Sequence, residues 1–200
     1  MKTRAEIKMQ ARIAFRAQYG NALGVFLLFT LLSSVIPGVG WLLLMPPLLV
    51  GYSYFSIKVF NQEQVLSSDF FSKGFADYGR NLAGVLWMYL FIFLWSLLLF
   101  IPGIIKALSY WMTPYILADC PKVEPAEALK LSMRMTQGYK GEIFVMFLSF
   151  IGWMLLSAMT GMILYLFYVG PYIHTSLAGY YLELKKNALE KGVVRPEELA

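Results

Sequence analysis

Three long stretches of this sequence are almost free of charged residues, and they constrain the fold more than any other feature. They run from Ala17 to Ile57, from Asn81 to Ala118 with only Lys106 inside, and from Ile143 to Leu182. Each is roughly 40 residues long, which is about 60 Å of helix against a hydrocarbon core of about 30 Å. Each stretch can therefore cross a bilayer twice. We expect an all-α, polytopic membrane bundle of six transmembrane helices, arranged as three hairpins.

The basic residues predict the orientation of this bundle. All of the 17 lysines and arginines except Lys106 lie at the chain ends or between the hairpins. The positive-inside rule then places both termini in the cytoplasm of a multi-pass protein of the cytoplasmic (cell) membrane. No basic patch interleaved with stacking aromatic residues lies in a polar segment, so we expect no nucleic-acid partner.

The whole length is expected to form a single integral-membrane domain, because three hairpins and their connections use all 200 residues. Tyr19-Gly20, Tyr78-Gly79 and Tyr139-Lys140-Gly141 open the three apolar runs at nearly even spacing, which indicates a repeated hairpin. Ile36-Pro37-Gly38 and Ile101-Pro102-Gly103 mark outer turns. The predicted parts are a basic interfacial helix (1–19), hairpins at 20–60, 78–119 and 139–184, an interfacial helix (123–138) and a cytoplasmic tail (185–200).

Prolines recur in the second helix of each predicted hairpin, at Pro47, Pro114 and Pro171. A proline inside a helix removes one backbone hydrogen bond, and lipid tolerates this only where neighbours or a polar cavity satisfy the freed carbonyl. We therefore expect a helix break at each of these positions. Pro125 and Pro196 have a different setting: acidic residues follow them closely, which is typical of the first turn of a helix.

The N-terminal segment carries a cation at every fourth residue: Arg4, Lys8, Arg12 and Arg16. This spacing puts the four charges on one helical face, and Ile7, Ala11 and Phe15 line an adjacent face. The pattern predicts a basic helix on the membrane surface. It serves either to fix the topology, the interpretation we favour, or to attract anionic phospholipid.

Two further residues are candidates for binding a lipid or anion. Lys106 is the one fixed charge within the apolar runs, and intramembrane charges often mark ligand paths; the alternative is a lysine that snorkels to the outer interface. His174 is the only histidine and follows Pro171 by three residues. No acid at membrane depth is available to it as a proton partner, so a packing role is the simpler interpretation.

Catalytic and metal signatures are missing from the sequence. It has no paired-histidine zinc spacing, no phosphate-binding glycine loop with a lysine, and no nucleophile elbow. The single cysteine, Cys120, excludes an internal disulfide and a cysteine metal cluster. We expect no enzyme activity, no metal and no cofactor.

The region from Ile101 to Trp153 resembles a known family. The motifs are Ile101-Pro102-Gly103-Ile104-Ile105-Lys106, Leu117-Ala118-Asp119, Gly138 with Lys140, and Leu148-Ser149-Phe150-Ile151-Gly152-Trp153. In combination they are similar to a bacterial integral-membrane family catalogued as domain of unknown function 975. That family is distantly similar to the membrane domain of some glycerophosphodiester phosphodiesterases. The resemblance implies a bacterial membrane protein and assigns no activity.

Composition, topology and resemblance together favour a non-enzymatic role. We expect an envelope-associated accessory or scaffold protein that contacts membrane lipids, another membrane protein or a second copy of itself. The alternative is a small transporter or lipid-handling protein, with a cavity where the prolines break the helices.

Overall fold

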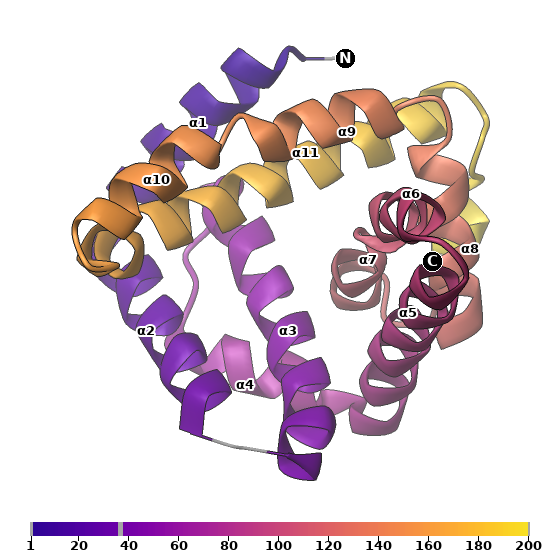
Figure 1. The fold of residues 1–200 in the computed structure, drawn as a ribbon, viewed down its shortest axis with the longest axis horizontal. Helices are drawn as coiled ribbons and strands as arrows, with labels where there is room; N and C mark the ends of the chain where they lie inside the picture. Colours follow the sequence, from indigo (N-terminus) through magenta and orange to yellow (C-terminus); the bar gives the residue numbers. More distant parts are fainter. Residues whose placement is uncertain (1, 36–37, 200) are drawn as a thin grey trace.

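The computed structural model describes residues 2–35 and 38–199, and in these ranges the chain folds into helices without a strand (Figure 1). The predicted turn at Ile36-Pro37 lies outside the described residues. The elements in chain order are α1 (Arg4–Ala17), α2 (Tyr19–Val35), α3 (Val39–Phe60), α4 (Ser67–Ala76), α5 (Tyr78–Leu98), α6 (Phe100–Tyr110), α7 (Thr113–Asp119), α8 (Pro125–Thr136), α9 (Lys140–Leu148), α10 (Ile151–Met159), the π-helix η1 (Tyr165–Val169), α11 (Gly170–Glu190) and the 3₁₀-helix η2 (Pro196–Leu199). The all-helical class is thus confirmed.

Helix α3 is the centre of the molecule. It contacts α1, α2, α4, α5, α7 and α11, and 61% of its apolar window is buried by the rest of the chain. In Figure 1, α1, α9, α10 and α11 run beside one another along one side of the molecule, and α2 and α3 lead away from them. Helices α5 to α8 form a second group that packs on α3 through α5 and α7.

Helix α1 packs lengthwise against α11. It begins with a capping box, in which the Thr3 side chain accepts from the Glu6 N–H while the Glu6 carboxylate accepts from the Thr3 N–H. Its apolar face is fully buried, at Ile7, Ala11, Ala14 and Phe15. Near its start the Lys2 N–H donates to Glu183, and beyond its end the Tyr19 hydroxyl donates to the carbonyl of Phe167. The predicted basic helix therefore exists, and its inner face packs on protein.

The six transmembrane helices expected from the sequence do not all appear as membrane-length helices. Within residues 2–35 and 38–199, three helices are long and apolar enough to span a membrane: Val39–Phe60, Tyr78–Leu98, and Lys140–Met159, which combines α9 and α10. Helices α1 and α2 make a fourth span only if they count as one, and they are bent by 96°. The second predicted hairpin differs because its return half divides into α6, of 11 residues, and α7, of 7 residues. Neither reaches the length of about 20 residues that a bilayer requires.

Two helix breaks have their freed carbonyls satisfied by other helices. Between α6 and α7, the carbonyl of Ser109 accepts hydrogen bonds from Ser132 (2.7 Å) and Thr136 (3.3 Å), both on α8. Between α9 and α10, the carbonyl of Ser149 accepts one from Lys8 Nζ on α1 (3.2 Å). An interrupted helix survives in an apolar setting only when such groups have partners, so these contacts make both breaks stable features of the fold.

The prolines behave differently from one another. Helix α3 continues through Pro46 and Pro47, so the break expected at Pro47 is wrong. Pro114 lies in the first turn of α7, where its missing N–H costs nothing because the first N–H groups of a helix have no partner within it. Pro171 is the second residue of α11, which follows the π-helix η1 without a gap, so the chain stays helical through this proline. Pro125 and Pro196 begin α8 and η2, as predicted.

Candidate functional site

A cavity of about 300 Å³ lies where α1 meets α10 and α11, and we call it the cationic cavity. Its lining residues are Ala5, Lys8, Met9, Arg12, Trp153 and Tyr172. Two of the four cations predicted on α1 thus face a defined cavity, and they do so together with two aromatic side chains from distant parts of the sequence.

The two cations are held by uncharged groups. Lys8 Nζ donates to the hydroxyl (2.8 Å) and the carbonyl (3.2 Å) of Ser149 and lies 4.2 Å from the centre of the Phe150 ring. The Arg12 guanidinium lies 5.8 Å from the centre of the Tyr172 ring. Hydrogen bonds and aromatic faces position the charges without neutralising them.

No ion pair within residues 2–35 and 38–199 joins Arg4, Lys8, Arg12 or Arg16 to a carboxylate. Arg4 and Arg16 are exposed and do not line the cationic cavity. Arg12 is exposed as well, so the four residues differ in whether they line the cavity, as Lys8 and Arg12 do, or lie outside it, as Arg4 and Arg16 do. Both pairs carry the same charge on the same helix.

Lys106 lies in an aromatic setting. Its Nζ is 4.8 Å from the centre of the Trp95 ring on α5, 5.6 Å from that of Tyr110, and 3.8 Å from the sulfur of Met133 on α8. A neighbouring cavity of about 190 Å³ is lined mainly by apolar residues and includes Tyr110 and Met133. These contacts differ from those of His174, so the structure does not bring the two candidate residues together in one site.

His174 packs among aromatic rings. Its ring is 4.8 Å from that of Tyr52, 6.1 Å from Phe26 and 6.3 Å from Phe29, measured between centres. Neither the cationic cavity nor the cavity beside Lys106 is lined by His174 or by Pro47, Pro114 or Pro171. This arrangement resembles a packed core more than a ligand site.

A polar junction of α5, α7 and α11 was not singled out from the sequence as a site. One Asp119 oxygen accepts hydrogen bonds from Lys185 Nζ (2.6 Å) and from the Tyr181 hydroxyl (2.9 Å). The guanidinium of Arg80, on α5, donates to the carbonyls of Leu117 and Cys120 at the end of α7. A cation at a helix C-terminus stabilises the helix dipole and caps its last carbonyls.

Beside this junction, burial raises the pKa of the Cys120 thiol, so the neutral form is favoured. A protonated, buried thiol is a poor nucleophile. Asp119 ends an apolar helix, and its lysine partner, Lys185, lies far along the chain. The aspartate was therefore the only residue in the sequence that pointed to this junction.

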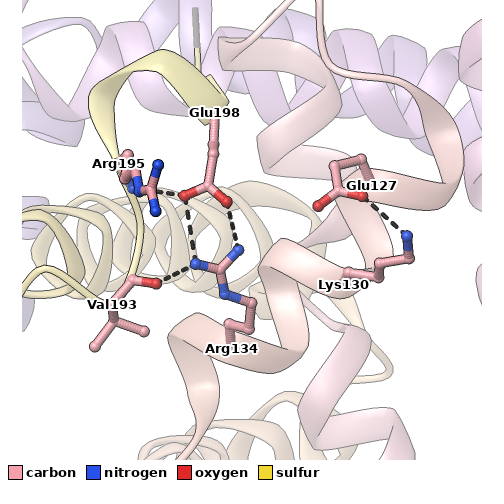
Figure 2. Close-up of polar contacts among 6 residues, drawn as sticks. All are labelled: Glu127, Lys130, Arg134, Val193, Arg195 and Glu198. Carbon is pink, nitrogen blue, oxygen red and sulfur yellow. Dashed lines mark hydrogen bonds and ion pairs between the residues drawn. The ribbon is translucent and has the colours of Figure 1, made fainter.

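A second polar cluster ties the C-terminal tail to α8 (Figure 2). The guanidinium of Arg134 donates to both carboxylate oxygens of Glu198, at 2.6 and 3.3 Å, and also to the carbonyl of Val193. The N–H of Arg195 donates to Glu198 at 2.7 Å. These contacts lower the pKa of Glu198 to about 2, chiefly through Arg134. On the same helix, Lys130 pairs with Glu127 at 3.1 Å.

The comparison with known proteins agrees with the resemblance noted in the sequence. A family model described as "Protein of unknown function (DUF975)" matches residues 85–188, which covers α5 to α11 apart from their outermost turns. No curated protein and no solved structure is significantly similar to the chain. The more distant similarity to the membrane domain of glycerophosphodiester phosphodiesterases is not confirmed. Because the matched region is more than half of the chain, the protein belongs to the DUF975 family.

Proposed function

We propose that this protein is a non-enzymatic, multi-pass protein of the bacterial cytoplasmic membrane, with both termini in the cytoplasm, that acts as an accessory or scaffold by contacting lipid and a membrane partner. The observation that carries the proposal is the outward apolar surface of two long helices. Only 22% of the apolar window is buried in α5, and the same share in Lys140–Met159. The remainder has to be covered by lipid or by another apolar surface.

The exposed side chains on these helices are large. On α5 they include Trp87, Leu90 and Phe93, and on α10 Met154 and Leu155. Water would disfavour such a surface strongly, at roughly 25 cal/mol for each Å². A lipid environment removes that cost, and a scaffold that recruits a partner within the membrane would use the same surface.

The proposed topology has six passes, in which some spans are interrupted helices. The return of the second hairpin would consist of α6 and α7 in series, and that of the third of η1 and α11. The satisfied carbonyls at the α6–α7 and α9–α10 breaks support interrupted spans, because broken helices occur at membrane depth where neighbouring helices supply partners. The repeat of three hairpins belongs to this proposal.

Reporter fusions test the topology. Fusions at Val39, Gly103 and Gly161 should report an outer location, and fusions after Lys122 and at the C-terminus a cytoplasmic one. Cytoplasmic signals at any of the first three positions would contradict six passes. Fractionation tests residence directly: recovery of the chain in the soluble fraction would refute the proposed function. Cross-linking in native membranes, with identification of the captured lipid and protein, then tests the scaffold role.

A transporter is the second candidate, and one observation favours it. Near the α6–α7 break, Trp111 Nε1, Thr113 Oγ1 and the Tyr180 hydroxyl are buried without a hydrogen-bond partner. Discontinuous helices with unsatisfied polar groups line the substrate sites of many transporters. Thr113→Val and Tyr180→Phe would impair a growth or flux phenotype of the intact protein if these groups bind substrate, whereas a scaffold would tolerate both changes.

A further inference from the structure

The cationic cavity combines three properties that packing alone does not require of a helix surface. It is concave, its two cations have no acidic partner within residues 2–35 and 38–199, and its lining includes the indole of Trp153 and the phenol of Tyr172. Fixed positive charge without a counter-ion is costly in an apolar environment unless an anion accompanies it. The search for an occupant therefore starts from an anion.

We propose that the cationic cavity binds the phosphate of an anionic phospholipid, with Lys8 and Arg12 as its ligands. The inference rests on the proposed membrane residence and adds a defined site to it. Arg12 offers a planar fork that suits two phosphate oxygens, and Lys8 supplies a point charge beside it. The two side chains are one helical turn apart, so both reach the same group.

The surroundings of the cavity fit a lipid rather than a free ion. Met9, which lines it, is an exposed apolar side chain on which an acyl chain can lie. Trp153 and Tyr172 are the residue types that occupy the headgroup level of a bilayer. A volume of about 300 Å³ suits a headgroup and leaves the acyl chains outside.

The contact between Lys8 and Ser149 gives the site a fixed geometry. Lys8 Nζ is held at the α9–α10 break by the Ser149 carbonyl and hydroxyl, so its position depends on that break. One further donor hydrogen remains on the ammonium for a ligand. The break would thus place a cation at the cavity mouth, where a continuous helix would have no free carbonyl to hold it.

A matched pair of variants tests the site. Arg12→Gln removes a cavity cation and leaves the Lys8–Ser149 contact in place, while Arg16→Gln removes an equal charge one turn away outside the cavity. The full-length protein is extracted from membranes containing phosphatidylglycerol, and the retained lipid is counted by native mass spectrometry. We expect Arg12→Gln to reduce phosphatidylglycerol retention about tenfold, Arg16→Gln to leave it near that of the wild type, and Arg12→Lys to restore part of it.

Three outcomes overturn the inference. Equal losses in Arg12→Gln and Arg16→Gln would show diffuse attraction between a basic helix and anionic lipid, with no site. Equal retention of phosphatidylglycerol and phosphatidylcholine by the wild type would show that the phosphate charge is not selected. Inorganic phosphate distinguishes a free anion from a lipid headgroup. In phosphatidylcholine nanodiscs, phosphate would then raise the thermal unfolding temperature of the wild type while added phosphatidylglycerol would not. That result would assign the site to a free anion. Each of these results leaves membrane residence, tested by fractionation, intact.

Discussion

At the scale of single residues, Asp119 joins two distant parts of the chain through its side chain. It is the last residue of α7. The structure adds Lys185 and Tyr181, both on α11 and more than 60 residues away. The ion pair is largely shielded, since the side chains of Lys185 and Asp119 are 21% and 25% exposed. Such a pair holds α7 against α11 and is costly to break from one side.

Asp119→Asn should therefore lower the free energy of unfolding by about 1.5–3 kcal/mol. The amide still accepts from Tyr181, but Lys185 keeps its charge in a partly buried position without a counter-ion. Thermal unfolding in detergent, followed by circular dichroism, measures the change. Glu197→Gln is the control, because Glu197 is an exposed acid with no ion pair in the described part of the chain. Equal midpoints for the two variants would contradict the structural role of Asp119.

At the scale of elements, the closest helix contact is between α3 and α4. A Cβ atom placed on Gly51 would lie 2.0 Å from the carbonyl oxygen of Phe70, and one on Gly74 would lie 2.4 Å from that of Pro47. The obstructing atoms belong to the backbone and cannot rotate away. These two glycines therefore set the distance between the helices, and α4 lies directly on the central helix because of them.

Gly51→Ala should destabilise the fold by about 1–3 kcal/mol, the usual cost of overpacking, because α3 or α4 has to move to make room for the methyl group. Gly24→Ala is the control: nothing lies within 4 Å of a Cβ at that position, so alanine should be neutral or stabilise α2 by up to about 1 kcal/mol. Both are measured by the same thermal unfolding experiment. A neutral Gly51→Ala would show that α4 does not pack on α3 as described.

The sequence predicted the helical class, the first turns at Pro125 and Pro196, and the amphipathic helix α1. It predicted an interruption at Pro114, and α6 ends at Tyr110 shortly before α7 begins at Thr113. It did not predict the break at Ser149–Phe150, where neither residue is proline or glycine and the freed carbonyl is bound by Lys8 on α1. Periodicity within one segment carries no information on such partners. Pro47 shows the converse: the residue type indicated a break, but α3 continues through it, and the carbonyl of Leu43 that Pro47 leaves without its helical partner accepts from the Tyr78 hydroxyl at 3.2 Å.

The sequence predicted only part of the candidate site, again because the rest depends on contacts between distant segments. The spacing of Lys8 and Arg12 placed them on one face, but nothing local distinguishes them from Arg4 and Arg16. The difference comes from Trp153 and Tyr172, which only the tertiary fold brings to α1.

At the scale of the whole molecule, the antiparallel packing of α1 on α11 links two predictions that the sequence treated separately. The sequence places α1 on the membrane surface and most of α11 within a span. The structure keeps the two side by side from Lys2 and Glu183 to Tyr19 and Phe167, so the two helices share their depth over that length. The proposed six passes put Tyr19 at the cytoplasmic face and Phe167 close to the outer turn at Gly161, whereas their hydrogen bond places the two residues at one depth. The reporter fusion at Gly161 therefore decides between an α11 that crosses the membrane and an α11 that lies along its surface with α1. The second arrangement keeps Lys8 and Arg12 at the level of the lipid headgroups, where the proposed site needs them.

The C-terminal tail, which follows the family region, is attached to α8 inside that region. Arg134 on α8 binds Glu198 through both oxygens, so η2 is attached to a helix that is more than 60 residues away (Figure 2). The pKa of Glu198 is lowered from 4.5 to about 2, first by Arg134 and then by the N–H of Arg195. A lowered carboxylate pKa means that the folded state favours the charged form. The contribution of Glu198 is therefore complete above pH 4.5 and is lost as the pH falls towards 2.

Hydrogen exchange of the segment 193–199 measures this attachment. At pH 7 the wild type should protect the segment more than Glu198→Gln does, because the neutral amide cannot form the charge-assisted pair with Arg134. The ratio of exchange rates between the two proteins removes the intrinsic effect of pH, and it should approach one as the pH falls from 4.5 to 2. Glu197→Gln, a neighbouring acid without an ion pair among the described residues, should match the wild type throughout. A ratio of one already at pH 7 would mean that Glu198 does not hold the tail on α8.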